Sequence, residues 1–256
     1  MGLTDPGQKS SAEDHARRVR EMFAKISPRY DLLNHLLSAN IDLRWRRHVV
    51  RKLKPLLTKD ARVLDVGCGT GDLSIELFEN TAAQVTGIDF CRPMLTLAQA
   101  KAPRLAFIEG DALHLPFADA SFEGLTIGFA LRNLASVEDG LGELLRVLKP
   151  NGVVAILEFS QPVGGLFRRL VGFYNRRLLP RIGGLLSGSR GAYEYLPDSI
   201  SKFPNQETLV GMMRAAGFED VRFENLSGGI AALHTAHRRS QDVNLASASK
   251  QLGAQA

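Results

Sequence analysis

Residues 62–72 read RVLDVGCGTGD, a short apolar run that ends in three alternating glycines. The helical spacing of Leu73, Leu77 and Phe78 follows directly, so the segment predicts a buried strand, a tight turn and a helix. Three glycines permit sharp turning and let a ligand lie against the backbone. Each glycine loses more conformational entropy on folding than another residue would, and a strand–helix turn that binds no ligand does not require three of them. We therefore expect a ligand to bind at this turn.

Short apolar strands and helices alternate in the rest of the chain. Two last strands, 221–226 and 230–237, are joined by Ser-Gly-Gly, which is short enough for an antiparallel hairpin. The alternation predicts an α/β fold with five parallel strands covered by helices on both faces and closed by this C-terminal hairpin. The other strands are expected at 62–67, 84–89, 105–109, 122–130 and 152–159, and helices at 72–78, 93–100, 137–148 and 206–216.

The composition is that of a globular protein, with 45% hydrophobic and 23% charged side chains among 256 residues. Disordered and collagen-like chains are thereby excluded. The apolar runs are far shorter than the roughly 20 residues that span a bilayer, the first ten residues do not resemble a secretory signal, and two cysteines cannot form a disulfide scaffold. We expect a cytoplasmic protein with a disordered N-terminus at 1–11, a helical N-terminal cap at 12–61, one domain at 62–240 with an insertion at 162–200, and a disordered tail at 241–256.

The net charge of +5 is unevenly distributed along the chain, with an acidic central segment between two basic ones. Residues 1–61 carry 13 basic and 7 acidic side chains, a net charge of +6, whereas residues 62–161 carry 7 and 13, a net charge of −6. Residues 162–200 carry 6 and 2, a net charge of +4. The predicted binding turn therefore lies in an acidic segment, which suits a cationic ligand, between two basic segments.

The residue after the glycine-rich turn indicates the type of ligand. The dinucleotide fingerprint requires a third glycine where this chain has Asp72, and a carboxylate at a helix start would repel a pyrophosphate. The turn therefore favours a nucleoside without phosphates, such as the cationic S-adenosylmethionine. Asp89, at the end of the second predicted strand, can accept both ribose hydroxyl hydrogens, unless it is an exposed loop residue. Asp111, after the third, could bind the adenine amino group or simply form a turn.

These positions, with LPFADASF at 115–122 and LRVLKPNG at 145–152, closely resemble the class I S-adenosylmethionine-dependent methyltransferases over roughly residues 60–240. That resemblance implies a Rossmann-like seven-stranded sheet. From about residue 19 to 237 the chain also resembles the ubiquinone/menaquinone biosynthesis C-methyltransferases. The motifs that carry this second resemblance are YDLLNHLLS at 30–38, DLRWRR at 42–47, FALRN at 129–133, LEFS at 157–160, LPRIG at 179–183 and YLPDSI at 195–200.

The resemblance implies that the cofactor is S-adenosylmethionine, with no metal. The family pattern departs at Gly128, where a cofactor-contacting serine can stand, so a contact there has to come from the backbone. Asp42 stands where the family can have histidine. The cofactor contacts that we expect are at Gly67, Gly69, Thr70, Asp89, Asp111, Ala112 and Gly128.

The reaction that the resemblance implies is C-methylation of a polyprenyl quinol ring, from demethylmenaquinol to menaquinol. A benzoquinol of ubiquinone biosynthesis is the alternative substrate. A ring carbon is a poor nucleophile until the neighbouring phenol is deprotonated. Arg132 is our candidate for holding the phenolate or orienting a water, unless it pairs with a surface acid. Asn133, Tyr30 and Asn34 could donate hydrogen bonds to the quinol, although Tyr30 could equally be a core aromatic.

The insertion at 162–200 predicts either a membrane contact or a cap over the active site. Its apolar residues share one helical face, opposite a basic face that includes Arg168, Arg169 and Arg176, which suits an anionic lipid surface. The apolar face consists of Leu166, Phe167, Leu170, Val171, Tyr174 and Leu178.

Other partners and other functions are alternatives to this hypothesis. A homo-oligomer or a quinone-synthesis assembly is possible for such an enzyme. A nucleic-acid methyltransferase is disfavoured, because GFAL at 128–131 replaces a base-flipping Asn-Pro-Pro-Tyr motif. A non-catalytic subunit that binds S-adenosylmethionine is the third alternative.

Overall fold

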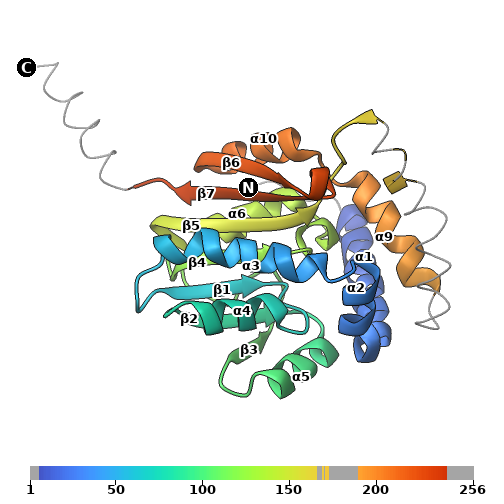
Figure 1. Cartoon of the computed structure of the whole chain (residues 1–256), viewed down its shortest axis with the longest axis horizontal. Helices are drawn as coiled ribbons and strands as arrows, with labels where there is room; N and C mark the ends of the chain where they lie inside the picture. Colours follow the sequence, from blue (N-terminus) through green and yellow to red (C-terminus); the bar gives the residue numbers. More distant parts are fainter. Residues whose placement is uncertain (1–5, 166–168, 170, 173–189, 241–256) are drawn as a thin grey trace, which may run out of the picture.

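The computed structural model describes residues 6–165, 169, 171–172 and 190–240. At its centre lies a seven-stranded sheet with the order β3-β2-β1-β4-β5-β7-β6 (Figure 1). The first five of these strands are parallel, and β7 is antiparallel to both β5 and β6. The predicted parallel core and C-terminal hairpin are thus confirmed. The strands are β1 (Arg62–Val66), β2 (Gln84–Asp89), β3 (Ala106–Glu109), β4 (Phe122–Gly128), β5 (Leu148–Phe159), β6 (Phe218–Leu226) and β7 (Ala231–Arg238).

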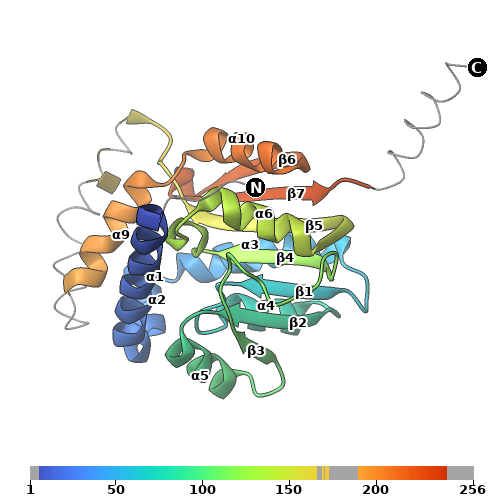
Figure 2. The same ribbon diagram turned by 180° about the vertical axis from the view of Figure 1, so that it is seen from behind.

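Helices cover both faces of the sheet (Figures 1 and 2). On one face α3 and α4 bury Trp45, Val49 and Leu77 against the strands. On the other, α6 and α10 bury Leu144 and Leu209 in a second apolar core. The sheet is therefore the middle layer of three, as its apolar central strands require. The helices of these two layers are α3 (Ile41–Leu53), α4 (Asp72–Asn80), α5 (Arg92–Lys101), α6 (Val137–Val147) and α10 (Gln206–Ala216).

Three strand boundaries differ by two residues or more from those predicted. β4 ends at Gly128 rather than at residue 130, because Phe129 takes a left-handed conformation with a φ of 59°. β5 begins at Leu148 rather than at 152, since Leu148 already pairs with Phe122 ahead of a register shift. β6 begins at Phe218 rather than at 221, again ahead of a register shift. Irregular pairing interrupts the alternation from which strands are predicted.

Three further helices lie together beyond the carboxyl ends of the parallel strands: α1 (Pro6–Ile26), α2 (Tyr30–Leu37) and α9 (Arg190–Lys202) (Figures 1 and 2). We call these three helices the cap. Helix α1 begins at Pro6, inside the stretch 1–11 that was expected to be disordered, and proline suits the first turn of a helix. The predicted N-terminal cap at 12–61 divides in two, since α3 packs on the sheet and only α1 and α2 cover its end.

Several expectations fall on residues that are not described. Most of the predicted amphipathic face in the insertion lies outside the described residues, as does the tail at 241–256. Among the helices that are described, none is both long and apolar enough to span a membrane.

A buried carboxylate joins three elements at the start of the glycine-rich turn. Asp65, at 1% exposure, accepts hydrogen bonds from Ser74 Oγ of α4 at 2.6 Å and from Thr126 Oγ1 of β4 at 2.7 Å. Burial raises the pKa of Asp65 to about 6, although both hydroxyl groups oppose the shift. Between pH 3.8 and about 6 the native protein therefore retains a proton on Asp65 that the unfolded chain has already released.

This raised pKa predicts a dependence of stability on pH. The contribution of Asp65 is present below its ordinary pKa of 3.8 and is lost as the pH rises through about 6. We expect the contribution of Asp65 to the free energy of unfolding of the wild type to fall by about 3 kcal/mol between those limits. The variant Asp65→Asn should lack this fall, whereas Asp60→Asn, at an exposed position, should retain it. Urea unfolding across this pH range measures the difference, and parallel curves for Asp65→Asn and the wild type would contradict the assignment.

Candidate active site

A cavity of about 410 Å³ lies where the carboxyl ends of the parallel strands meet the cap. The sheet contributes the glycine-rich turn and the residues that follow β2, β3 and β4. The cap contributes Ala16, Arg20, Phe23 and Tyr30. The sequence predicted the sheet side of this wall, because parallel strands bring their carboxyl ends to one edge. It did not place α1 there.

Gly67 and Gly69 line the cavity and have φ values of +63° and +56°. A Cβ atom on Gly67 would lie 2.4 Å from Ala130 Cβ, so this glycine is required for the turn to pack. A Cβ atom on Gly69 would have no atom within 4 Å. The space beside Gly69 is therefore open to a ligand, as predicted from the sequence.

The two glycines should respond differently to alanine. We expect Gly67→Ala to lower the free energy of unfolding by several kcal/mol, because it adds a clash to the cost of a left-handed alanine. Gly69→Ala should cost only about 1–2 kcal/mol but weaken ligand binding at least tenfold, since its methyl group enters the open space. Thermal unfolding and calorimetric titration with S-adenosylmethionine measure the two effects. Equal losses of stability would contradict this division of roles.

Asp89 lies at the carboxyl end of β2, on the cavity wall. It is 8% exposed, and its two oxygens accept hydrogen bonds from the backbone N–H groups of Gly69 and Cys91, each at 2.8 Å. Burial raises the pKa of Asp89, while these backbone hydrogen bonds oppose the shift. Each carboxylate oxygen can accept a second hydrogen bond, so the group is held in place with free acceptor capacity. This is what a ribose diol requires, and the alternative of an exposed loop residue is wrong.

Of the remaining residues expected to contact the cofactor, three line the cavity and one does not. Asp111, Ala112 and Gly128 line the cavity. The Asp111 carboxylate also accepts a hydrogen bond from Leu113 N at 2.9 Å, so its predicted turn role is present as well. Thr70 is 2% exposed and is not among the cavity-lining residues.

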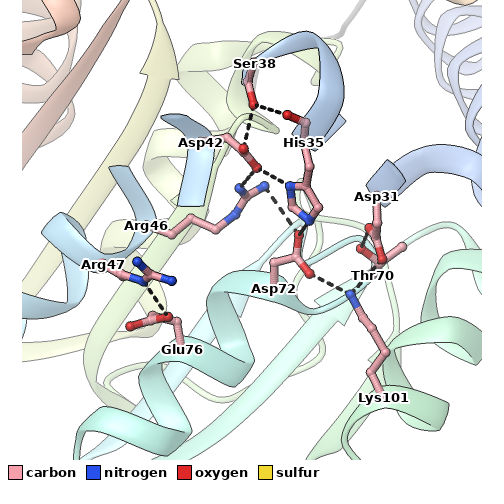
Figure 3. Close-up of polar contacts among 10 residues, drawn as sticks. All are labelled: Asp31, His35, Ser38, Asp42, Arg46, Arg47, Thr70, Asp72, Glu76 and Lys101. Atoms are coloured by element: carbon pink, nitrogen blue, oxygen red, sulfur yellow. Dashed lines mark hydrogen bonds and ion pairs between the residues drawn. The ribbon is translucent and has the colours of Figure 1, made fainter. Parts of the chain in front are cut away.

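Thr70 instead connects the glycine-rich turn to the cap (Figure 3). Its hydroxyl group donates to Asp31 Oδ1 of α2 at 2.5 Å, and Lys101 Nζ of α5 lies 2.9 Å from Asp31 Oδ2. The same ammonium group lies 2.6 Å from Asp72 Oδ1. The negative charge of Asp72 is thus paired, which weakens the argument that it would repel a phosphate. Lys101 therefore joins Asp72, at the start of α4, to Asp31 of the cap.

A second polar cluster surrounds Asp42, whose role the sequence left unclear (Figure 3). The Asp42 carboxylate is buried and is contacted by Ser38 Oγ at 2.6 Å, His35 Nδ1 at 2.9 Å and the Arg46 guanidinium. These contacts outweigh burial and hold the pKa of Asp42 below its usual value. The donor atoms of His35, Asp42 and Asp72 lie within 4.8 Å of one another, close enough to reach one metal ion. An ion there would have to displace cations that already pair with both carboxylates, so the donor set does not fit a metal.

Arg132 is not among the cavity-lining residues. It belongs to the short 3₁₀ helix Leu131–Asn133, and its Nη1 atom lies 2.7 Å from Glu158 Oε1 at the end of β5. The side chains of Arg132 and Glu158 are 6% and 1% exposed, so the partner is a buried acid and not the surface acid that was the alternative. The predicted contact of Arg132 with the substrate therefore stays a proposal.

The other expected substrate residues lie closer to the cavity. Asn133 and Tyr30 line it, whereas Asn34 does not. Tyr30 also packs edge-on against Phe23, with ring centroids 5.9 Å apart, so the alternative role of an aromatic packing residue is present, and its contact with the quinol stays a proposal. Burial raises the pKa of Tyr30, opposed by a hydrogen bond with Asn34 and by the charge of Arg132.

Two residues that sequence reasoning did not assign belong to this region. Tyr195 of α9 donates its hydroxyl hydrogen to Asn133 Oδ1 at 3.0 Å, and Glu158 pairs with Arg132. Both stand in motifs that carried the resemblance, LEFS and YLPDSI, and those motifs were the signal that could have found them.

The fold occurs in solved structures of known type. The [4+2]-cyclase SpnF superposes with a TM-score of 0.64 at 20% identity, over 88% of this chain and 96% of that one. A methyltransferase from Thermotoga maritima, described as S-adenosylmethionine-dependent and as a possible histamine N-methyltransferase, gives 0.63 at 18% identity, over 86% and 99%. These likenesses show the fold alone: the chain has the Rossmann-like seven-stranded sheet of the class I methyltransferase type, with a glycine-rich turn and Asp89 at its strand ends.

The chain belongs to the ubiE/COQ5 methyltransferase family, whose model matches residues 10–238. The demethylmenaquinone methyltransferase of Thermus thermophilus is 49% identical over 222 residues, which cover 85% of this chain and 100% of that protein. The ubiquinone/menaquinone biosynthesis C-methyltransferase UbiE of Citrifermentans bemidjiense is 44% identical over 229 residues, covering 86% and 96%. The predicted family is confirmed: the chain is a methyltransferase enzyme, and S-adenosylmethionine is its co-substrate.

Proposed function

We propose that the enzyme methylates a ring carbon of a polyprenyl quinol, converting demethylmenaquinol to menaquinol. The observation that carries this proposal is the 49% identity, over the full length of the relative, to a protein named demethylmenaquinone methyltransferase. A relative in Deinococcus radiodurans, 46% identical over 232 residues that cover 89% of this chain and 95% of that protein, has the same name. The open space beside Gly69 and the free acceptor capacity of Asp89 support the binding of S-adenosylmethionine in the cavity.

The chemistry proposed for the site depends on the weakness of the nucleophile. When bound, S-adenosylmethionine supplies an electrophilic methyl group. The quinol ring carbon attacks well only when the adjacent hydroxyl group has lost its proton, so a positive charge near that oxygen lowers the barrier. Arg132 supplies such a charge at the edge of the cavity, where it already acts on Tyr30. Asn133 and Tyr30, which line the cavity, orient the ring by neutral hydrogen bonds.

An aromatic cluster offers the ring an apolar surface. Phe129 lines the cavity and packs against Phe159, with ring centroids 4.6 Å apart, and against Trp45 at 5.9 Å. The Phe129 ring, supported from behind by the other two, gives the cavity an apolar surface that suits a planar quinol. It also excludes water from the reacting atoms, which strengthens every charge interaction there.

A benzoquinol of ubiquinone biosynthesis is the second candidate substrate. It is favoured by relatives such as the one from Citrifermentans bemidjiense, whose name includes both pathways. Contact with a membrane surface through 162–200 belongs to the same proposal, because a polyprenyl tail resides in the bilayer. Association into a homo-oligomer or a quinone-synthesis assembly stays a hypothesis.

Mass spectrometry of the quinones in a strain that lacks the gene tests the function. Accumulated demethylmenaquinone, removed by the wild-type gene but not by Asp89→Ala, is the expected result. A demethylated benzoquinone precursor would favour the second substrate. An unchanged quinone pool would contradict both and leave the nucleic-acid and non-catalytic alternatives to be tested with purified protein.

A further inference from the structure

Glu158 is a buried acid that the proposed chemistry does not use. It lies in β5, which is flanked by β4 and β7, and it is 1% exposed. Removing a carboxylate from water costs several kcal/mol unless it is paired and hydrogen-bonded. A residue of this kind at the carboxyl end of a central strand has either a structural role or a role in the adjacent site.

Both oxygens of Glu158 are directed at one neighbour. Oε1 accepts hydrogen bonds from Arg132 Nη1 at 2.7 Å and from Phe159 N at 2.8 Å, and Oε2 accepts one from Arg132 N at 3.3 Å. Burial raises the pKa of Glu158, and the charge of Arg132 opposes the shift. The carboxylate thus holds both the backbone and the side chain of Arg132.

The guanidinium group is fixed on one side only. Its Nη1 atom also donates to the carbonyl oxygen of Phe129, and its Cζ atom lies 5.2 Å from the centroid of the Phe159 ring. Its Nε atom is buried and has no hydrogen-bond partner among the described residues. An unsatisfied donor on a buried cation is costly, so such groups tend to occur where a ligand or a reacting group supplies the acceptor.

The positive charge of Arg132 acts on tyrosine side chains at the cavity and beside it. It opposes the rise in the pKa values of Tyr30, on the cavity wall, and of Tyr195, which donates to the cavity-lining Asn133. Glu158 therefore determines where a positive charge lies beside the proposed quinol site.

We propose that Glu158 is a positioning residue for methyl transfer, which holds Arg132 so that its positive charge lies close to the quinol oxygen. This inference rests on the proposed function. The proposal assigns two separate roles in the site. Asp89 and the glycines bind the co-substrate, and the Glu158–Arg132 pair promotes the reaction of the quinol. Loss of Glu158 should consequently affect turnover and leave co-substrate binding intact.

A double-mutant cycle on purified full-length enzyme tests the proposal. Glu158→Gln keeps the shape of the side chain, and we expect kcat with demethylmenaquinol to fall about 100-fold, while the Kd of S-adenosylmethionine and the KM of the quinol change less than threefold. In an Arg132→Gln background, Glu158→Gln should have little further effect on kcat, because the two residues act as a unit. Glu123→Gln is the matched control, since Glu123 also pairs with a cation across two strands, Lys149, but at the start of β4.

The outcomes are distinguishable. Independent, multiplicative losses of kcat in the cycle, or a Glu158→Gln variant as active as the wild type, would overturn the role of Glu158. If Glu158→Gln does not fold, Glu158→Asp replaces it, and its kcat must fall while its Kd for S-adenosylmethionine is retained. A wild-type enzyme that methylates no quinol contradicts the proposed function itself.

Discussion

Replacing Asp89 with alanine is expected to weaken the binding of S-adenosylmethionine by roughly 100- to 10,000-fold. A hydrogen bond to a charged acceptor contributes about 1.5–3 kcal/mol, and Asp89 can accept one from each of two ribose hydroxyl groups. The carboxylate is held for this task by the N–H groups of Gly69 and Cys91. Its removal also frees the two loops that it joins, so both effects act in the same direction. Calorimetric titration measures the change in Kd.

Two companion variants separate these contributions. Asp89→Asn keeps one acceptor oxygen and should lose less affinity than Asp89→Ala. Asp60→Ala removes an exposed carboxylate in the turn before β1 and should leave the affinity unchanged. An Asp89→Ala enzyme with wild-type affinity would contradict the assignment of the cofactor site.

Arg132→Ala should lower kcat by at least 100-fold while the affinity for S-adenosylmethionine changes little. The proposed role of the guanidinium is to stabilise the charge that develops on the quinol oxygen, and loss of one such donor costs about 100- to 1000-fold in rate. Arg132 is outside the residues that line the cavity, so the binding wall itself stays intact. Steady-state kinetics with demethylmenaquinol, paired with calorimetry, measure the two quantities separately.

Stability has to be controlled in this experiment. Without Arg132 the carboxylate of Glu158 is buried and unpaired, which costs about 3–5 kcal/mol. The double variant Arg132→Ala/Glu158→Gln removes that charge and should recover most of the loss of stability but none of the activity. Recovery of turnover in the double variant would show that Arg132 acts only on the fold.

Local sequence patterns predicted the elements and the edge of the sheet where the site lies. β2 and α10 have the predicted bounds, because clear signals such as the left-handed Gly217 after α10 end the periodic runs. Gly69 donates a backbone hydrogen bond to Asp89, because β1 and β2 are neighbouring parallel strands that bring their carboxyl ends together. These predictions rest on periodicity and topology, which a single sequence contains.

The contacts that complete the site could not be predicted in the same way. Thr70 and Asp31 are 39 residues apart, and Arg132 and Glu158 are 26 apart. Pairing between such residues depends on how the elements pack, and no local spacing encodes it. For this reason the sequence did not indicate the contacts Thr70–Asp31 and Arg132–Glu158, and the roles of Asp42 and Glu158 were not recognised.

Helix α3 has a consequence for where the chain can be divided. It precedes the first strand, yet Trp45, Val49, Val50 and Leu53 fill the core on one face of the sheet. A fragment that begins at β1 would expose the apolar surface of α4 and β5 that these side chains cover, and would tend to aggregate. The smallest unit that can bury its own interior therefore starts at Ile41, and fusions or truncations of this enzyme should be designed upstream of that residue.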